Sequence, residues 1–239
     1  MAFELASRDA APVVWEMATG RVDYLHAVER MEREAAAIRA DGAPERVWLL
    51  EHEHVYTGVT SAGADELLDT GGFPVHRTGR GGRFTYHGPG QRVGYVMLDL
   101  KARKPDVRAY VHALEEWLIR ALAMLGVTAE RRSGRVGLWV EDVTGEAKIA
   151  AVGVRLKRWV SLHGVALNVD PDLARFAGIV PCGLRDFGVT SLAELGETTE
   201  RAAVDAALEA AFLEVFGGPL VPPTQACAPA AVDFTPLRR

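Results

Sequence analysis

The run RGGRFTYHGPGQ at residues 80–91 combines four glycines with a proline, a histidine and a tyrosine just before an expected strand. Glycine at this density allows positive φ angles and lets backbone N–H groups approach a ligand closely. The run has neither the GxxxxGK[ST] pattern of a Walker loop nor a GxGxxG that opens a helix. Its composition alone favours a turn-rich hairpin, and a loop that cradles a ligand is the functional alternative.

Two basic residues follow on segments that we expect to be strands. Lys148 stands at the head of the apolar run that leads to Gly153, where a lysine is usually a surface residue whose stem covers the core. The functional alternative is a partly desolvated amine that exchanges protons near neutrality. His163 precedes Gly164 on the next strand, and a lone histidine there is more often structural than a ligand or a base.

Cys182 and Cys227 are the two cysteines, too few for a disulfide framework and without the paired spacing of a zinc knuckle. Cys182 lies between Pro181 and Gly183, in a turn that would present its sulfur and leave nearby backbone N–H groups free to bind an oxyanion. Cys227 lies in a stretch rich in proline and alanine, and we expect it to be an incidental free thiol.

His52 and His54 would fall on one face of a strand, a spacing that could hold a metal ion. No third ligand is evident from the sequence. We therefore predict no metal site and no cofactor, and a role for this histidine pair stays open.

The elements around these segments follow from hydrophobic periodicity. Apolar residues at three- and four-residue intervals predict helices at residues 20–40, 105–125 and 199–216. Runs rich in β-branched or alternating residues predict strands at 47–52, 94–100, 136–141, 149–155 and 160–168. Because helices and strands mix without a regular βαβ order, we expect an α+β fold. Residues 1–218 are expected to form a single catalytic domain, and residues 219–239 a Pro/Ala-rich tail that is laid over the surface or mobile.

The composition is that of a globular protein, since 49% of the 239 residues are hydrophobic and 25% are charged. The formal net charge of −5 argues against a general nucleic-acid binder, which needs a basic surface. The first 20 residues carry acidic groups where a secretion signal would be basic, and no window approaches a membrane-spanning run. We therefore expect a cytoplasmic protein that binds neither nucleic acid nor membrane.

The four segments, in this order, resemble the octanoyl-[acyl carrier protein]:protein N-octanoyltransferase family, also called lipoyl(octanoyl) transferases. The hallmark RGGxxTYHGPGQ is matched at residues 80–91, and the other matches are GYVMLDLK at 94–101, the lysine segment at 148–150, HGxALN at 163–168, PCG at 181–183 and GVTSL at 188–192. The likeness extends over about residues 49–195. Two positions depart from the family: Glu53-His54 stand where prolines are common, and Val180 where histidine is frequent.

The resemblance implies a fold shared with biotin and lipoate protein ligases, which is a mixed sheet flanked by helices with a smaller sheet beside it. It implies that Cys182 is the acyl-accepting nucleophile and Lys148 its activator, with His163 as an auxiliary candidate. The implied substrate pocket is lined by Arg80, Gly81, Gly82, Arg83, Phe84, Thr85, Tyr86, His87, Ala151, Val152, Gly153, Gly164, Val165 and Ala166.

The resemblance also implies the reaction and its partners. An octanoyl or lipoyl group would pass from acyl carrier protein to Cys182, and then to a lysine of a lipoyl domain, without ATP. The implied acceptors are the lipoyl domains of 2-oxoacid dehydrogenase complexes and the glycine cleavage H protein. The oxyanions would be bound by backbone N–H groups near Gly183 and at Gly81-Gly82. The acyl channel is expected to be walled by Phe84, Tyr86, Val152 and Val165.

Two other functions stay open from the sequence. An ATP-dependent lipoate or biotin protein ligase would share the fold, although Cys182 in the PCG turn argues against it. A non-catalytic lipoyl-domain binding protein is the second, although the presence of both Cys182 and Lys148 argues against it. Because acyl carrier proteins are acidic and this chain is too, the donor must dock on a local positive patch. The candidate patches are Lys101, Arg103 and Lys104, and Arg131, Arg132 and Arg135.

Overall fold

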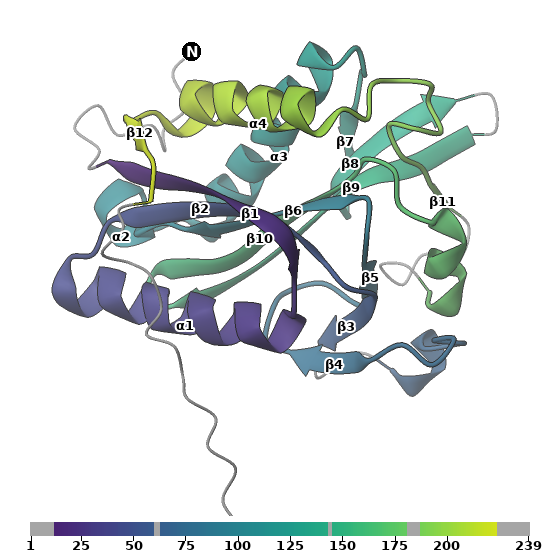
Figure 1. Ribbon diagram of the computed structural model, residues 1–239, viewed down its shortest axis with the longest axis horizontal. Coiled ribbons are helices and arrows are strands. Elements are labelled where there is room, and N and C mark those ends of the chain that lie inside the picture. The colour runs from purple at the N-terminus through teal and green to yellow at the C-terminus, as the bar shows by residue number, and fades with distance from the viewer. Residues whose placement is uncertain (1–11, 60–62, 143–144, 181–186, 224–239) are drawn as a thin grey trace, which may run out of the picture.

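A mixed sheet of nine strands lies at the centre of the part of the chain that the structure, a computed structural model, describes: residues 12–59, 63–142, 145–180 and 187–223 (Figure 1). Its strands are β1 (Val13–Val22), β2 (Glu45–His52), β6 (Gln91–Met97), β7 (Glu130–Arg132), β8 (Arg135–Asp142), β9 (Gly145–Lys157), β10 (Val160–Asn168), β11 (Gly188–Val189) and β12 (Leu220–Val221). They are ordered β12-β1-β2-β6-β10-β9-β8-β7, with β11 paired to β9 off this path. The pairs of β1 with β2 and β12, and of β9 with β11, are parallel.

A second, three-stranded sheet lies beside the first and contains β3 (Val55–Val59), β4 (Val75–Thr78) and β5 (Thr85–His87), in the order β4-β3-β5. The helices are α1 (Tyr24–Asp41), α2 (Leu100–Arg103), α3 (Val107–Met124) and α4 (Arg201–Phe216), with 3-10 turns η1 (Ala64–Glu66) and η2 (Leu173–Gly178). Helix α1 covers one face of the main sheet, and α3 and α4 cover the other (Figure 1). The expected α+β fold with a smaller accessory sheet is confirmed. None of the described helices is both long and apolar enough to cross a membrane.

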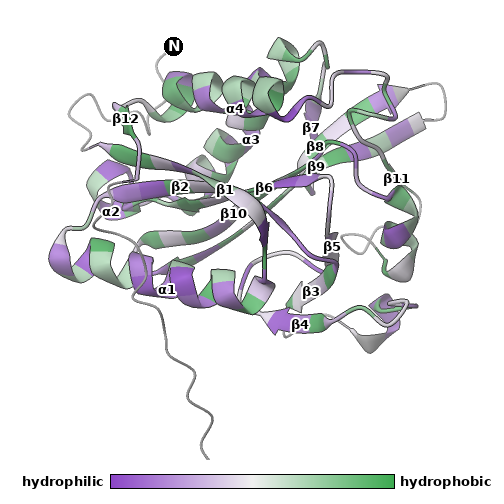
Figure 2. Ribbon diagram, viewed as in Figure 1, coloured by the Kyte–Doolittle hydropathy of each residue, from purple (hydrophilic) through white to green (hydrophobic). Residues whose placement is uncertain are grey.

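The two faces of the main sheet carry separate apolar cores. On one face Met31 and Ile38 of α1 pack on Trp48 and Met97 of the sheet. On the other face Trp117 of α3 packs against aromatic rings of α4 and donates its indole N–H to the Leu208 carbonyl at 2.7 Å. Accordingly, α1 alternates hydrophilic and hydrophobic bands, whereas α4 is hydrophobic along much of its length (Figure 2).

The N-terminal helix begins later than its periodicity predicts. Residues 13–22 form β1, which pairs in parallel with β2, so the helix cannot begin at residue 20. Asp23 ends the strand and caps α1, because its carboxylate accepts the His26 N–H at 2.9 Å. The pairing of β1 with a strand more than 20 residues away in sequence is a tertiary choice that helical periodicity does not reveal.

The first residues of the predicted tail belong to the sheet. Val13 and Val14 pair with Leu220 and Val221, and the Val13 N–H donates to the Pro219 carbonyl at 3.0 Å. Strand β12 therefore closes the β1 edge of the main sheet. Residues 224–239, which include Cys227, lie outside the described part of the chain.

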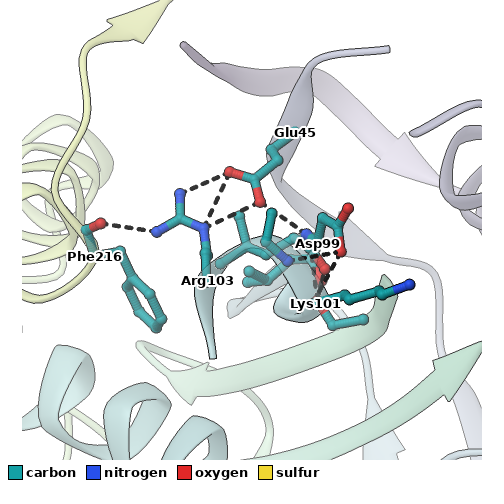
Figure 3. A network of polar contacts seen from close by, with 9 residues as sticks. Glu45, Asp99, Lys101, Arg103 and Phe216 are labelled. Carbon is teal, nitrogen blue, oxygen red and sulfur yellow. Dashed lines mark hydrogen bonds and ion pairs between the residues drawn. The ribbon is translucent and has the colours of Figure 1, made fainter. Parts of the chain in front are cut away.

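Arg103 joins three elements at the end of the sheet (Figure 3). Its guanidinium pairs with Glu45 at the start of β2, with Nη2 2.6 Å from Oε2, and Nη1 donates to the Phe216 carbonyl at the end of α4 at 2.9 Å. Glu45 also accepts the Asp99 N–H at 2.7 Å. The Arg103 side chain is only 2% exposed, so the expectation that it belongs to a docking patch is wrong. Lys101, in contrast, extends its amine away from this network (Figure 3).

Replacement of Arg103 by Met should lower the free energy of unfolding by about 3 kcal/mol, because it leaves the Glu45 carboxylate largely buried without its cation. Urea unfolding at neutral pH measures this loss. The matched control is Arg21→Ala, whose pair with Glu53 is 51% and 64% exposed. Its loss should be below about 1 kcal/mol. Equal losses in the two variants would contradict the structural role of Arg103.

Candidate functional site

A cavity lies between the glycine-rich loop and the middle of strands β9 and β10. Most of the wall is apolar or backbone, with a few polar side chains. The lining residues are Arg80, Gly81, Gly82, Arg83, Phe84, Thr85, His87, Val93, Tyr95, Ala151, Val152, Gly153, His163, Gly164, Val165 and Ala166.

The structure thus brings together the three segments that were expected to form a pocket, with one exception. Tyr86 does not line the cavity. Its ring is fully buried beside the small sheet, 5.3 Å from the ring of Phe176 and 5.5 Å from that of Tyr56. Because side chains alternate along a strand, Tyr86 points away from the face that Thr85 and His87 present to the cavity. The expectation that Tyr86 walls an acyl channel is wrong.

Val93 and Tyr95 line the cavity and were missed from the sequence. They flank Gly94 on β6, which directly follows the glycine-rich run. Alternation along a strand places residues 93 and 95 on one face, so the sequence could have predicted that they lie on the same side of β6.

Arg80 holds the glycine-rich loop in place. Its guanidinium is largely buried and donates to the carbonyls of Thr57 at 2.7 Å, Arg83 at 2.9 Å and Gly81 at 3.0 Å. The loop is also joined to β9, because the Gly81 N–H donates to the Val154 carbonyl at 2.8 Å. That N–H is therefore already used, and the expectation that Gly81 contributes an oxyanion donor does not fit this geometry.

The opposite wall of the cavity depends on a close approach of two backbones. A Cβ atom on Gly164 of β10 would lie 2.3 Å from the Gly94 carbonyl oxygen of β6. No side chain fits at that distance, so only glycine allows β6 and β10 to pair there. The glycine in the HGxALN segment is thus required by the sheet beneath the cavity.

His52 and His87 form a buried, uncharged pair beside the cavity, and His87 lines it. The His52 Nδ1–H donates to the Val22 carbonyl at 2.7 Å, and its Nε2 accepts from the Tyr95 hydroxyl at 2.7 Å. His87 donates to Gln91 Oε1 at 2.6 Å. Burial lowers the pKa of His52 to about 4 and that of His87 to about 3. Both imidazoles are therefore neutral at pH 7.

His163 also lies on this wall, where burial, and then the charges of Arg80 and Arg155, lower its pKa to about 4. Its backbone has a φ of +61°, which is rare for a residue other than glycine, and its ring meets that of Tyr95 edge-on. The His163 imidazole makes no hydrogen bond to another side chain or backbone group within the described residues. A neutral imidazole at the cavity wall offers one donor and one acceptor to a ligand.

The shared face expected for His52 and His54 is wrong, because β2 ends at His52. The imidazole of His54 instead stacks on Phe73 at 4.4 Å and is hydrogen-bonded to the Tyr86 hydroxyl at 2.7 Å. Within the described ranges, no group of three or more His, Cys, Asp or Glu side chains is placed to hold a metal ion.

Lys148 lies on β9, three residues before the cavity wall begins at Ala151. It is only 6% exposed, so it is not the surface residue that its position in the sequence favoured. Its Nζ donates to the Val136 carbonyl at 2.9 Å and lies 4.9 Å from the centre of the Trp139 ring. The structure therefore desolvates this amine and gives it defined partners.

Cys182, the expected nucleophile, and Gly183 lie in residues 181–186, outside the described part of the chain. The residues that follow this segment contact Lys148 and its neighbours. The Phe187 ring lies 5.4 Å from that of Trp139, Val189 of β11 is in register with Lys148, and the Thr190 N–H donates to the Lys148 carbonyl at 3.0 Å. Residues 187–190, which follow this segment, thus lie directly beside Lys148 and Trp139.

The second basic cluster is engaged by carboxylates. Arg131 pairs with Glu115 at 3.2 Å and with Glu116 at 2.9 Å. Arg132 and Arg135 both pair with Glu146 on the neighbouring strand. Their charges are compensated locally, which weakens the expectation that this cluster attracts an acidic partner.

Acidification should destabilise the protein through its buried histidines. In the unfolded chain an imidazole titrates near pH 6.5. Between pH 6.5 and 4 it is therefore protonated in the unfolded state but neutral in the folded state. The contribution of the neutral imidazoles to the free energy of unfolding is therefore fully present above pH 6.5 and is lost as the pH falls. For each buried imidazole, the free energy of unfolding should fall by about 2 kcal/mol between pH 7.5 and pH 5.

Urea unfolding of His163→Asn at pH 7.5 and pH 5 isolates one of these contributions, since asparagine tolerates a positive φ. The pH-dependent loss should be about 2 kcal/mol smaller than in the wild-type chain. The matched control is His26→Asn, which replaces an exposed histidine of α1 and should leave the pH dependence unchanged. Identical pH dependence in all three proteins would contradict the assignment of His163.

Comparison with known proteins gives matches to sequence families and to solved structures. A family model described as the lipoyl protein ligase A/B catalytic domain matches residues 23–213. An octanoyltransferase of Paramagnetospirillum magneticum is 60% identical over 207 residues, which cover 86% of this chain and 98% of that protein. An octanoyltransferase of Sphingopyxis alaskensis is 63% identical over 195 residues, which cover 81% of this chain and 89% of that protein.

The structural matches are more distant in sequence. A lipoate-protein ligase A bound with ATP has a TM-score of 0.65 and 19% identity, with 90% of this chain and 89% of that chain covered. A bi-partite lipoate protein ligase from Thermoplasma acidophilum has a TM-score of 0.66 and 19% identity, with 90% and 87% covered. At such identities the likeness is one of fold alone.

Proposed function

Because this chain belongs to the lipoyl protein ligase A/B catalytic domain family, and curated octanoyltransferases are 55–63% identical to it, we propose that it is an octanoyltransferase of lipoate biosynthesis. It transfers an octanoyl or lipoyl group from acyl carrier protein to a lysine of a lipoyl domain. The observation that supports this most is the desolvated Lys148 amine on β9, between the cavity and the flank of the segment that contains Cys182.

The proposed reaction has two half-reactions that share Lys148. In the first, the Cys182 thiol gives its proton to Lys148, the thiolate attacks the carbonyl carbon of the donor thioester, and the carrier thiol leaves with the proton. In the second, the amine of the target lysine attacks the Cys182 thioester. An amide forms, and Lys148 moves the proton of the amine to the departing Cys182 sulfur. One thioester replaces another in the first half-reaction, so no ATP is needed.

The cavity supports the acyl chain as a ligand. Its wall includes the apolar side chains of Phe84, Val93, Val152 and Val165. Each methylene that leaves water for such a wall contributes about 0.8 kcal/mol, so a medium-length chain gains several kcal/mol. We propose that the remaining lining residues, including Arg80, Gly153 and Gly164, place the thioester end.

The proposed partners are the octanoyl-acyl carrier protein as donor and, as acceptors, the lipoyl domains of 2-oxoacid dehydrogenase complexes and the glycine cleavage H protein. The family to which the chain belongs and the acidic donor both fit a reaction in the cytoplasm. Of the two basic clusters considered for donor docking, Arg103 is buried and Arg131, Arg132 and Arg135 are paired with glutamates. Of the first cluster Lys101 and Lys104 remain, with Lys101 exposed and Lys104 half-buried.

An ATP-dependent ligase is the second candidate, because a ligase bound with ATP shares this fold. That enzyme class activates a free acid, whereas the proposed reaction starts from a thioester. A donor assay in which ATP is omitted therefore separates the two. A non-catalytic lipoyl-domain binding protein would give no product in either condition.

Incubation with octanoyl-acyl carrier protein, without ATP, should place a hydroxylamine-labile acyl group on Cys182. Mass spectrometry of the intact and digested chain locates this group. Cys182→Ala should abolish both the acyl enzyme and the transfer to a lipoyl domain, because no other thiol is expected to be activated. The matched control, Cys227→Ala, should keep full activity. An acyl group on Cys227, or product that forms only with ATP, would overturn the proposal.

Lys148→Met should slow alkylation of Cys182 by iodoacetamide about tenfold at pH 7, because the thiol loses its proton acceptor. The rate should recover at high pH, where the thiol ionises unaided. The matched control is Lys101→Met, which replaces an exposed lysine with the same side chain. If Lys148→Met has the pH profile of the control, Lys148 has no part in the mechanism, and His87 and His163 become the bases to examine.

A further inference from the structure

We infer that Glu115 of α3 is a positioning residue for Lys148, acting through the single peptide group between Val136 and Gly137. This inference rests on the proposed function, because it assumes that the Lys148 amine activates a thiol. Glu115 has no other role in the proposed reaction. It is a carboxylate in the buried face of a helix whose neighbouring residues are largely apolar, which is a costly place for a charge.

One peptide group connects the two charges. The Gly137 N–H donates to Glu115 Oε1 at 3.0 Å, and the carbonyl of the same peptide, that of Val136, accepts from Lys148 Nζ at 2.9 Å. A carboxylate at the N–H end and an amine at the C=O end polarise the peptide in the same sense. Hydrogen bonds in such a chain strengthen one another, and both terminal bonds are assisted by charge when the amine is protonated.

The local backbone is shaped for this contact. Between the pairs Leu138↔Ala150 and Trp139↔Lys148 the ladder of β8 and β9 shifts register, so Ile149 is an extra residue on β9. A bulge of this kind re-aims neighbouring side chains. Gly137 has a φ of +108°, and a Cβ atom there would lie 2.6 Å from the Ala150 carbonyl oxygen and 3.2 Å from Lys148 Nζ. The Lys148 amine therefore occupies space that a side chain at position 137 would take.

Other groups around the amine do not replace this connection. The Trp139 ring lies against Lys148 Nζ, and the Arg135 guanidinium, paired with Glu146, also lies against that ring at 4.6 Å. On the side of α3, Glu115 is flanked by Arg131 at 3.2 Å and by His112 at 3.6 Å. Of these described groups, Glu115 is the carboxylate bonded to the peptide that holds Lys148.

The chemical consequence is a preference for the ion pair that the reaction requires. When Cys182 gives its proton to Lys148, the amine becomes an ammonium ion. A carboxylate behind the Val136 carbonyl makes that carbonyl a better acceptor for the ammonium and thereby favours the thiolate. It also fixes the amine in one place, so less ordering is needed when substrate binds.

The test compares Glu115→Gln with Glu116→Gln. Glutamine keeps the shape of Glu115 and an oxygen for the Gly137 N–H but removes the charge. Glu116 is the next residue of α3 and shares the partner Arg131, at 2.9 Å, but is not bonded to Gly137. The measurements are the iodoacetamide labelling rate of Cys182 against pH, the rate of acyl-enzyme formation from octanoyl-acyl carrier protein, and the urea midpoint of each variant.

We expect Glu115→Gln to slow both reactions about three- to tenfold at pH 7 and to move the labelling profile to higher pH by about half a unit or more. Glu116→Gln should match the wild type in labelling while losing similar stability. Equal labelling profiles in the two variants, whether both unchanged or both shifted, would overturn the inference. Labelling needs no acyl donor. A wild-type chain that is not acylated would contradict the proposed function, whereas the labelling comparison would still decide the role of Glu115.

Discussion

The pairing of strand β9 is the constraint on which the candidate site depends. One strand carries both the cavity wall, at residues 151–153 in its middle, and Lys148 three residues earlier. It pairs with β8 along one edge, and with β10 and β11 along the other. The separation between the cavity and the Lys148 backbone is therefore set by the strand ladder rather than by flexible side chains.

The polar groups near the cavity are compatible with burial for two different reasons. The histidines give up their charge, because burial favours the neutral imidazole, and they then join hydrogen bonds such as that from Tyr95 to His52. Arg80 cannot give up its charge, and its guanidinium instead donates to backbone carbonyls of the loop that it holds and of β3. The wall of the site is thus largely uncharged apart from Arg80 and from Arg83, which is paired with Glu66.

The fold of the family does not by itself determine the reaction that a member catalyses. Lipoate protein ligases with 19% identity share the fold of this chain, and a shared fold does not by itself imply a shared chemistry. What separates a thioester transferase from a ligase is the presence of an activated thiol. In this chain the proposed thiol is that of Cys182, and the structure shows a buried lysine, Lys148, beside the residues that follow the cysteine segment.

The sequence by itself determined α1 apart from its start, α3, α4 and the strands β2, β6, β8, β9 and β10, because 3.6- and 2-residue periodicities are local signals. The segments that line the cavity followed from the family resemblance carried by motifs such as RGGRFTYHGPGQ. The sequence did not determine β1 or β12, whose pairing joins residues near the two ends of the domain. It also did not reveal that Arg103 is buried by Glu45, that Tyr86 points away from the cavity, or that Glu115 reaches the peptide beside Lys148. These are contacts between residues far apart in the chain. Arginine, tyrosine and glutamate are also found at exposed positions, so the residue type does not predict burial or a partner. Only the tertiary structure decides which group each one contacts.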